Sequence, residues 1–179
     1  EITPAETEAF VQLPRIEDIQ SASKEEIVSA LLSGGLWGHL KAAPFKKIAE
    51  PSETPPAIFV SIDEDEPYLP DSNILFSDKV VQDEFRQGLK ILRKLTDGNV
   101  FVGVSKKNKN LQNVFSDSIT HTLEGNYPAN DPYVFLYHHK TSSDLNKSWI
   151  ISAQNCLDFA RLLKTGQYPT SRLVVLAGA

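Results

Sequence analysis

The stretch Leu31–Pro70, LLSGGLWGHLKAAPFKKIAEPSETPPAIFVSIDEDEPYLP, decides the fold. It predicts the end of a helix, a glycine-containing turn, and a buried strand over residues 57–62 that leads into an acidic loop. The strand is almost continuously apolar, which is typical of a central strand in a parallel sheet. Ligands of open α/β sheets bind at the carboxyl ends of such strands. The stretch therefore predicts an α/β sheet with a candidate binding site at the acidic loop.

The turn before this strand contains three glycines, Gly34, Gly35 and Gly38, which are candidate residues for binding a phosphate group. A phosphate cradle needs residues without Cβ, because backbone N–H groups must close on the anion. The remaining residues of the turn and those just after it are bulky: Leu36, Trp37, His39 and Leu40. We therefore expect Trp37 to pack into the turn, and we expect no cofactor to bind there.

Helices and strands alternate around this stretch. Ser23 and Glu26 form a capping-box pattern, which predicts the start of a helix that ends at Gly34 and Gly35. The strand over residues 57–62, a helix over 79–95 and a strand over 100–104 predict a right-handed βαβ unit. Further strands are expected over residues 118–123, 133–137, 148–151 and 172–177, and a last helix over residues 153–164 that stops at Gly166. The predicted fold class is α/β, with a Rossmann-like, mostly parallel sheet flanked by helices.

The composition is that of one globular domain, with 179 residues, 41% hydrophobic and 23% charged. We expect a connector over residues 1–22 and the α/β domain over residues 23–179. The chain has no methionine and begins at Glu1, so we expect a fragment of a longer subunit. No apolar run is long enough to span a bilayer. The net charge is −5, and the basic run Lys106–Lys109 lacks interleaved aromatics, so no nucleic-acid partner is expected.

Polar and reactive residues give no clear catalytic centre. The acidic run Asp63–Glu66 lacks the glycine and distal glutamate of a calcium loop, so a solvated turn is the default and a ligand-facing loop the alternative. The histidines are His39, His121, His138 and His139, and none of their spacings is that of a zinc motif. On a strand, the adjacent His138 and His139 would point to opposite faces, and we expect surface or strand-end histidines. Cys156 lies on the apolar face of the last predicted helix, where we expect a buried structural thiol. No metal site is expected.

Several segments, in order and spacing, resemble the A subunit of the bacterial sodium-translocating NADH:quinone reductase. They are SKEEIVSALLSGGLW (23–37), APF (43–45), AIFVS (57–61), LTDGNVFV (95–102), GNYPA (125–129) and LAG (176–178). Two loops depart from the usual family pattern, at residues 62–67 and 136–139. The segment Glu66–Leu69 is closer to the C subunit of the Rnf electron-transport complex, and is similar to the acidic loop of the complex I flavoprotein subunit.

The resemblance implies a domain related to the flavin- and NADH-binding domain of complex I, placed between an amino-terminal barrel-like module and a carboxyl-terminal β-grasp module. In complex I the loop that matches residues 33–45 is a glycine-rich flavin cradle. Here Gly34, Gly35, Gly38 and Glu66 would be vestigial flavin-loop positions, with no cofactor bound in this fragment. The resemblance places NAD, flavins, iron–sulfur centres and quinone in other subunits of the complex.

The resemblance also implies partners and a location. The partners would be the other subunits of the membrane reductase complex, together with quinone, at the cytoplasmic face of the bacterial inner membrane. The fragment would serve electron transport and sodium transport through assembly, without a catalytic centre of its own. The enzymatic alternative is a flavin- and NADH-binding domain of the Rnf or complex I type, using Glu66 and the turn at Gly34–Gly38. A nucleotide-free α/β interaction domain is the third hypothesis.

Overall fold

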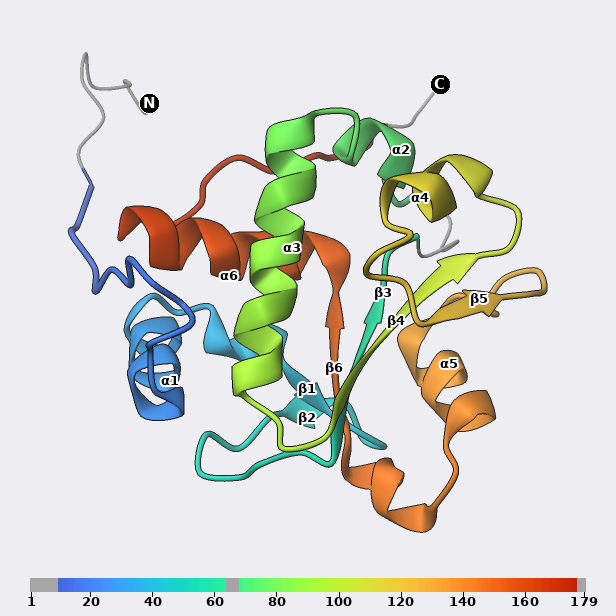
Figure 1. Ribbon diagram of the computed structural model, residues 1–179, viewed down its shortest axis with the longest axis horizontal. Helices are drawn as coiled ribbons and strands as arrows, with labels where there is room; N and C mark the ends of the chain where they lie inside the picture. Colours follow the sequence, from blue (N-terminus) through green and yellow to red (C-terminus); the bar gives the residue numbers. More distant parts are fainter. Residues whose placement is uncertain (1–9, 64–67, 177–179) are drawn as a thin grey trace.

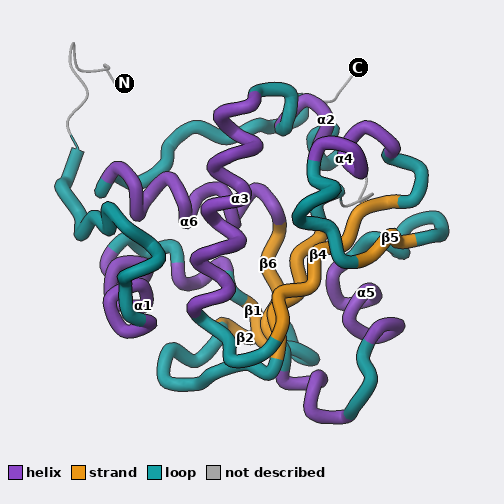
Figure 2. The backbone as a smooth tube through the Cα atoms, viewed as in Figure 1, coloured by secondary structure: helices purple, strands orange, loops and turns teal. Residues whose placement is uncertain are grey.

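The computed structural model describes residues 10–63 and 68–176 and confirms the α/β class (Figure 1). One six-stranded sheet lies at the centre, with strand order β2-β1-β6-β3-β4-β5. The strands are β1 (Lys41–Ala42), β2 (Lys47–Ile48), β3 (Ala57–Ser61), β4 (Asn99–Ser105), β5 (His121–Leu123) and β6 (Trp149–Ser152). The helices surround this sheet (Figure 2).

The four strands β6, β3, β4 and β5 are parallel, and the hairpin of β1 and β2 joins them antiparallel to β6. The register pairs Ser61 at the end of β3 with Gly103 on one side and with Ser152 on the other. The predicted βαβ unit is confirmed as β3, α3 and β4. The predicted central strand is likewise confirmed, because β3 has parallel neighbours on both sides.

The three expected helices form in the expected order, and three further α-helices, α2, α4 and α5, are present among the described residues. They are α1 (Lys24–Ser33), α2 (Ser72–Leu75), α3 (Lys79–Lys94), α4 (Lys109–Val114), α5 (Pro132–His139) and α6 (Ala153–Thr165), with 3-10 turns η1 (Trp37–His39) and η2 (Ser143–Lys147). The capping box is present, because Ser23 Oγ accepts from Glu26 N and the Glu26 carboxylate accepts from Ser23 N at 2.8 Å. Gly166 ends α6 in the left-handed conformation, with φ of 66°.

Alternating side chains of the sheet build a core on each face. Ile58 and Val60 of β3 belong to the larger cluster, formed with α1, α3 and α6, whereas Ala57 and Phe59 belong to the smaller cluster under α5. Strand β6 divides in the same way, with Trp149 and Ile151 on the first face and Ile150 on the second. The two-residue period of a strand therefore explains why the central run is almost continuously apolar.

Helices α3 and α6 pack against each other at backbone distance (Figure 1). A Cβ added at Gly88 in α3 would lie 2.5 Å from the carbonyl oxygen of Cys156 and 2.6 Å from its Sγ. Cys156 is fully buried, as expected, and burial raises the pKa of its thiol. Gly88 thus sets the spacing of the two helices.

The predicted strand over residues 133–137 is wrong, because this segment is helix α5. Asp131 caps the helix, with Oδ1 accepting from Tyr133 N at 2.8 Å and from Val134 N at 3.2 Å. Pro132 occupies the first turn, where its missing N–H costs nothing. The Asp-Pro pair was the local signal for a helix, and it outweighed the aromatic and β-branched run that follows. His138 and His139 consequently lie on a helix and not on opposite faces of a strand.

Other boundaries also differ. The strand expected over residues 118–123 is shorter, as β5 covers His121–Leu123. No strand forms over residues 172–176, and residue 177 lies outside the described part of the chain. Arg172 is held beside α6 by an ion pair with Asp158, so this apolar segment follows a helix and does not reach a sheet edge. The hairpin of β1 and β2 was not predicted at all.

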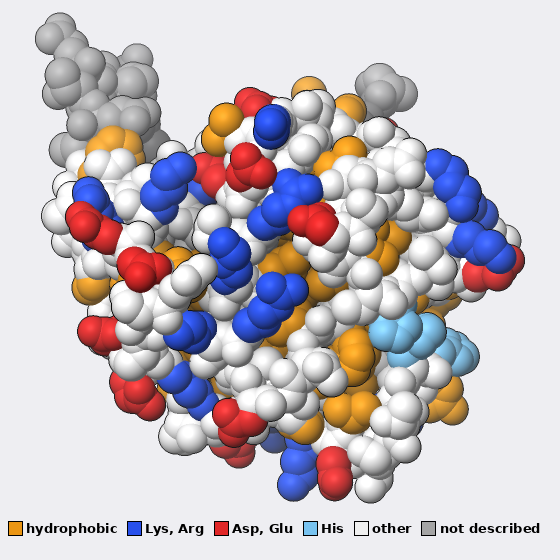
Figure 3. Space-filling model, in the orientation of Figure 1, with side chains coloured by type: hydrophobic (Ala, Val, Ile, Leu, Met, Phe, Trp, Pro, Cys, Tyr) orange, Lys and Arg blue, Asp and Glu red, His pale blue; other side chains and the backbone are white. Residues whose placement is uncertain are grey.

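A histidine pair lies where α5 meets the edge strand β5. The rings of His121 and His139 are 4.6 Å apart between centroids, and both contact the ring of Phe135. Thr120 Oγ1 lies 2.8 Å from His121 Nδ1. Burial lowers the pKa of both imidazoles, and the charge of His139 lowers the pKa of His121 further. Figure 3 shows histidine side chains gathered at this side of the molecule.

We predict that Gly88→Ala destabilises the domain by about 1–3 kcal/mol, although alanine is the better helix former. The added methyl group meets the backbone of Cys156, which cannot move without separating α3 from α6. Urea unfolding followed by circular dichroism measures the change. Gly38→Ala is the matched control, because a Cβ there meets no atom within 4 Å. A Gly88→Ala variant as stable as the parent would contradict this packing.

We also predict that acidification weakens the domain through the histidine pair. The folded-state pKa of both His121 and His139 is lowered from 6.5. Their contribution to the free energy of unfolding is therefore complete above that pH. It is lost as pH falls from the unfolded-state pKa toward the folded-state pKa. The urea midpoint should drop between about pH 7.5 and about pH 5, and it should drop less in His139→Gln. The exposed His138→Gln variant removes only the weaker effect, because the charge of His138 lowers the pKa of His139 less than burial does, so its midpoint should fall nearly as much as that of the parent. An equal slope in all three proteins contradicts the prediction.

Candidate functional site

The carboxyl ends of β3 and β6 form the natural binding edge of this sheet. Chain connections leave β3 toward β4 on one side, whereas β6 lies on the other side, so the strand order reverses between β3 and β6. Ligands of open α/β sheets bind at such a reversal. Ser61 and Ser152 are register partners there, and Ser152 also caps helix α6. This edge is therefore the expected position of a ligand-binding site.

A cleft of about 350 Å³ opens at this edge, and we call it the strand-end cleft. Its walls combine apolar and polar side chains: Ser61, Ile62, Leu69, Pro70, Ser72, Leu75, Ser152, Ala153, Gln154, Asn155 and Arg172. Several polar groups already have protein partners. Ser61 Oγ donates to the carbonyl of Asn130 at 2.7 Å, and Ser152 Oγ accepts from Asn155 N at 3.3 Å. The cleft can accommodate a small ligand with apolar and polar parts.

Arg172 closes one side of the strand-end cleft. Its Nη2 donates to Asp158 Oδ2 at 2.6 Å and to Asn155 Oδ1 at 2.8 Å. Asp158 is 1% exposed, and its Oδ1 is buried without a hydrogen-bond partner among the described residues. The arginine therefore neutralises a buried carboxylate of α6 and presents only part of its guanidinium to the cleft.

The acidic loop after β3 is described only in part. Asp63 is buried, and its Oδ1 accepts from Ser105 N at 2.7 Å, so this carboxylate links the ends of β3 and β4. A solvated turn was the default interpretation of the acidic run, and Asp63 departs from it because the backbone N–H of β4 needs an acceptor there. Glu66, with residues 64, 65 and 67, lies outside the described residues. Its predicted role remains a prediction.

The glycine turn, residues 34–38, is the end of helix α1. Gly35 has φ of 70°, Gly35 N donates to Leu32 O at 3.0 Å, and Leu36 N donates to Leu31 O at 3.0 Å. These two bonds are the pair that defines a Schellman motif, in which the left-handed residue is usually glycine. A Cβ at Gly34 would lie 2.3 Å from Leu162 Cδ2 of α6. Helix termination and packing thus account for Gly34 and Gly35.

Bulky side chains of this turn are buried, which confirms the expected packing of Trp37. Leu36 and Leu40 are fully buried, and Trp37 is 3% exposed. Trp37 Nε1 donates to the carbonyl of Ala49 at 2.7 Å, and its ring meets Trp149 edge-on with centroids 5.6 Å apart. His39 is half-buried beside them, and burial lowers the pKa of its imidazole, with Arg172 acting in the same direction and Asp158 opposing.

The glycine turn and the strand-end cleft lie at opposite ends of β6. Trp37 contacts Trp149, the first residue of β6, whereas the strand-end cleft begins at Ser152, the last. Three residues of strand separate these positions by about 10 Å. The lining of the cleft includes Leu69 and Pro70 from beyond the acidic loop but no residue of the glycine turn. The glycine turn is close to β3 in the sequence, but the topology places it at the start of β6 and the strand-end cleft at the end of β6.

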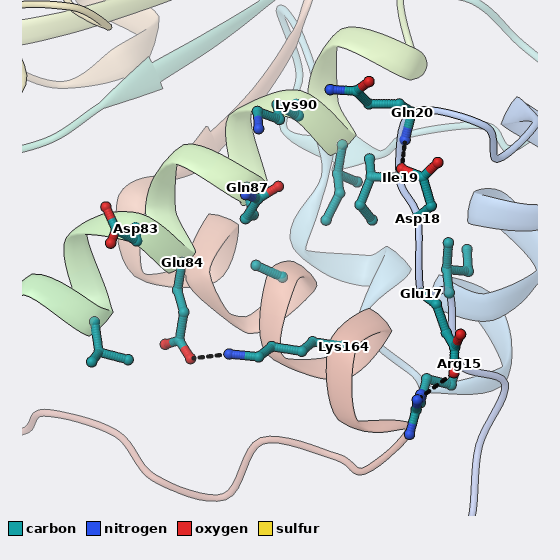
Figure 4. Close-up of a pocket in the computed structure, with 14 residues that line it drawn as sticks. Arg15, Glu17, Asp18, Ile19, Gln20, Asp83, Glu84, Gln87, Lys90 and Lys164 are labelled. Atoms are coloured by element: carbon teal, nitrogen blue, oxygen red, sulfur yellow. Dashed lines mark hydrogen bonds and ion pairs between the residues drawn. The ribbon is translucent and has the colours of Figure 1, made fainter.

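A second hollow, which the sequence did not suggest, lies between residues 15–20, α3 and α6 (Figure 4). This groove has a volume of about 730 Å³. Backbone bonds hold the chain along α6, because Leu13 N donates to Gly166 O and Ile16 N donates to Leu163 O, both at 2.8 Å. The spacing of Leu13, Ile16 and Ile19 was the available signal, since all three pack against the larger core.

Charged groups around the groove largely pair with one another. Glu84 Oε2 accepts from Arg161 Nε at 2.9 Å, and Glu84 Oε1 lies 3.9 Å from Lys164 Nζ. Arg15 pairs with Glu17 at the rim. Paired charges over an apolar floor suit contact with a polypeptide segment more than a chemical reaction. Over residues 10–63 and 68–176, no cluster of three or more metal-binding side chains forms, and no helix is long and apolar enough to cross a membrane.

Comparison with known proteins gives a consistent result. The family model described as "NqrA second alpha/beta domain" matches residues 22–168. Among curated relatives, the A subunit of the Na(+)-translocating NADH-quinone reductase of Serratia proteamaculans is 30% identical over 170 residues, 94% of this chain and 37% of the relative. The corresponding protein of Rhodopirellula baltica is 31% identical over 159 residues, 88% of this chain and 34% of the relative.

The corresponding protein of Saccharophagus degradans is 29% identical over 177 residues, 97% of this chain and 38% of the relative. The chain thus spans somewhat more than a third of the length of these relatives. The matched region contains the central strands, α1 with the glycine turn, and α3 packed on α6. The chain belongs to the family of NqrA second alpha/beta domains.

Proposed function

We propose that this chain is a docking domain within the A subunit of a sodium-translocating NADH:quinone reductase. It serves electron transport and sodium transport by holding partner subunits in place, and it carries no redox cofactor itself. We assign quinone contact to the strand-end cleft, whose apolar walls and hydroxyl and amide groups suit a neutral ring with carbonyl groups. The domain would work at the cytoplasmic face of the membrane.

The main support for this proposal is that backbone N–H groups of the glycine turn terminate helix α1. A flavin cradle needs free backbone N–H groups on residues without Cβ. Here the N–H groups of Gly34, Gly35 and Leu36 donate to the last carbonyls of α1 at 2.9–3.0 Å. These three N–H groups thus terminate α1 and are not available to a phosphate. The buried Leu36 and Trp37 fill the adjoining volume. The same residues argue against the flavin- and NADH-binding alternative.

The groove along the N-terminal segment (residues 10–22) supports the docking part of the proposal. It is open to solvent, it is bordered by α3 and α6, and its charged residues come from both helices (Figure 4). Interfaces between subunits combine an apolar centre with a polar, charged rim. Ile16, Ile19 and Ile91 provide the apolar centre here, and Asp83 and Lys90 lie on the rim.

The first test asks whether the purified chain holds flavin. After incubation with flavin mononucleotide and gel filtration, we expect the protein fraction to be colourless, because the N–H groups of Gly34, Gly35 and Leu36 are already bonded to carbonyls of α1. Visible absorbance and flavin fluorescence measure retention, and an established flavoprotein treated in parallel provides the positive control. Stoichiometric yellow protein would overturn the proposal in favour of the flavin-binding alternative.

The second test asks whether the groove docks a partner subunit. We expect the tagged chain to copurify the membrane subunits of the reductase from solubilised membranes. The double variant Asp83→Lys/Lys90→Glu should retain far less, since it reverses two charges at the groove without changing the net charge. Lys106→Glu/Glu124→Lys, which reverses a surface pair beside the edge strand β5, is the matched control. Retention by the groove variant equal to that of the parent would exclude this docking surface.

A further inference from the structure

The β1–β2 hairpin, residues 41–48, exposes an aromatic side chain at its tip. Phe45 is 79% exposed and Ile48 is 60% exposed. Single apolar side chains on a surface are ordinary, but these two share the hairpin with three lysines: Lys41, Lys46 and Lys47. The segment contains no acidic residue, although the whole chain carries a net charge of −5. The hairpin is thus a local basic and apolar element on an acidic protein.

Register places the positive charges on both sides of this tip. Lys41 pairs with Ile48 across the hairpin, and Lys47 pairs with Ala42, so Lys41 and Lys47 lie on opposite faces. Lys46 lies at the tip, with Nζ 4.6 Å from the centre of the Tyr133 ring. The lysines therefore lie on both faces of the hairpin and at its tip, and do not form a patch on one face. Such an arrangement suits a hairpin that enters a planar boundary with its tip first.

The hairpin lysines keep their positive charge uncompensated, although Lys46 Nζ also contacts the face of the Tyr133 ring. None of the three forms an ion pair with a carboxylate of the described residues. The other basic run behaves differently. Lys106 pairs with Glu124 at 2.8 Å, Lys107 donates to Asn126 Oδ1 at 2.8 Å, and Lys109 donates to Gln112 Oε1 at 3.2 Å. The two runs hold three lysines each, but a carboxylate neutralises one lysine of the second run, Lys106, and none of the hairpin lysines among the described residues.

We propose that the hairpin is a contact with the surface of an anionic lipid bilayer. Phe45 would enter the headgroup region, where aromatic rings are favoured, and Lys41, Lys46 and Lys47 would bind lipid phosphates. This inference goes beyond the proposed docking function and does not depend on it. The η2 turn joins the hairpin through Ser148, whose carbonyl accepts from Ala43 N at 2.9 Å. That turn carries one charge of each sign and so adds no net charge to the contact.

Size favours a bilayer over a protein partner. A specific protein interface buries about 800 Å² on each side, whereas one phenylalanine buries about 150–250 Å². A two-residue edge strand is also short for pairing with a strand of another protein. A bilayer needs no such area, because apolar insertion and several lysines act together with modest total affinity. The hairpin therefore suits a weak second attachment beside a protein–protein contact.

The test uses flotation of the purified chain with protein-free vesicles. Vesicles of phosphatidylcholine with one third phosphatidylglycerol should bind it weakly, with a partition constant on the order of 10³–10⁴ M⁻¹. Vesicles of phosphatidylcholine alone should bind far less. Raising sodium chloride from about 0.1 M to about 1 M should abolish binding, because the Debye length falls from about 10 Å to about 3 Å. The described chain begins at the left of Figure 1 and ends at its top, whereas the hairpin of β1 and β2 lies in the lower half.

Matched variants locate the contact. Lys41→Gln/Lys46→Gln/Lys47→Gln should weaken binding about a hundredfold, since each lysine near an anionic surface contributes about fivefold. Lys106→Gln/Lys107→Gln/Lys109→Gln carries the same net charge and should bind like the parent. Phe45→Ser should weaken binding about tenfold, whereas Ile74→Ser, at a residue 61% exposed on α2, should not. Thermal unfolding verifies that each variant is folded.

Three outcomes would overturn the proposal. The first is no flotation with anionic vesicles. The second is equal loss of binding in the two triple-lysine variants, which would indicate a non-specific effect of charge. The third is hairpin-dependent binding to membranes that contain reductase subunits but not to protein-free vesicles, which would assign the hairpin to a protein partner. None of these results bears on flavin retention, so they leave the proposed function untouched.

Discussion

The approach of α3 to α6 at backbone distance is the contact on which the rest of this domain depends. Gly88 permits it, because any side chain there would collide with the Cys156 carbonyl. With the two helices in place, α6 becomes the support for most other elements. Gly34 of the glycine turn packs against its Leu162, the N-terminal segment bonds to its last turn, and Arg172 binds its Asp158. One missing Cβ in α3 thus sets the position of the helix that both ends of the described chain contact.

Sequence reasoning succeeded where one local signal acted alone. The apolar run of β3, the capping box at Ser23 and the stop at Gly166 each have one physical meaning, and the structure agrees with all three. It failed where two signals competed. The aromatic and β-branched residues of 133–137 indicated a strand, and the preceding Asp131-Pro132 pair indicated a helix start. Capping satisfied two backbone N–H groups at once, so the helix formed.

The candidate site was predictable in part, for a different reason. The glycine turn and the strand ends were both identified, and the burial of Trp37 was foreseen from its size. The separation of the glycine turn from the strand ends was not foreseen, because distance along the sequence does not tell which end of β6 each of them reaches. The strand-end cleft depends on Asn155 and Arg172, residues far along the chain from β3, and only the topology brings them to it. The hairpin escaped prediction because strands of two residues leave no periodic pattern.

The buried carboxylate of Asp158 gives the C-terminal segment, residues 167–176, an unexpected importance. Its counter-charge comes from Arg172, a residue on an otherwise exposed stretch of chain. Any force or partner that draws this stretch away would leave a negative charge inside the apolar packing of α6, which is strongly unfavourable. The path of the segment and the integrity of the helix core are therefore thermodynamically linked. An event outside the domain that redirects the segment would therefore destabilise the core around α6.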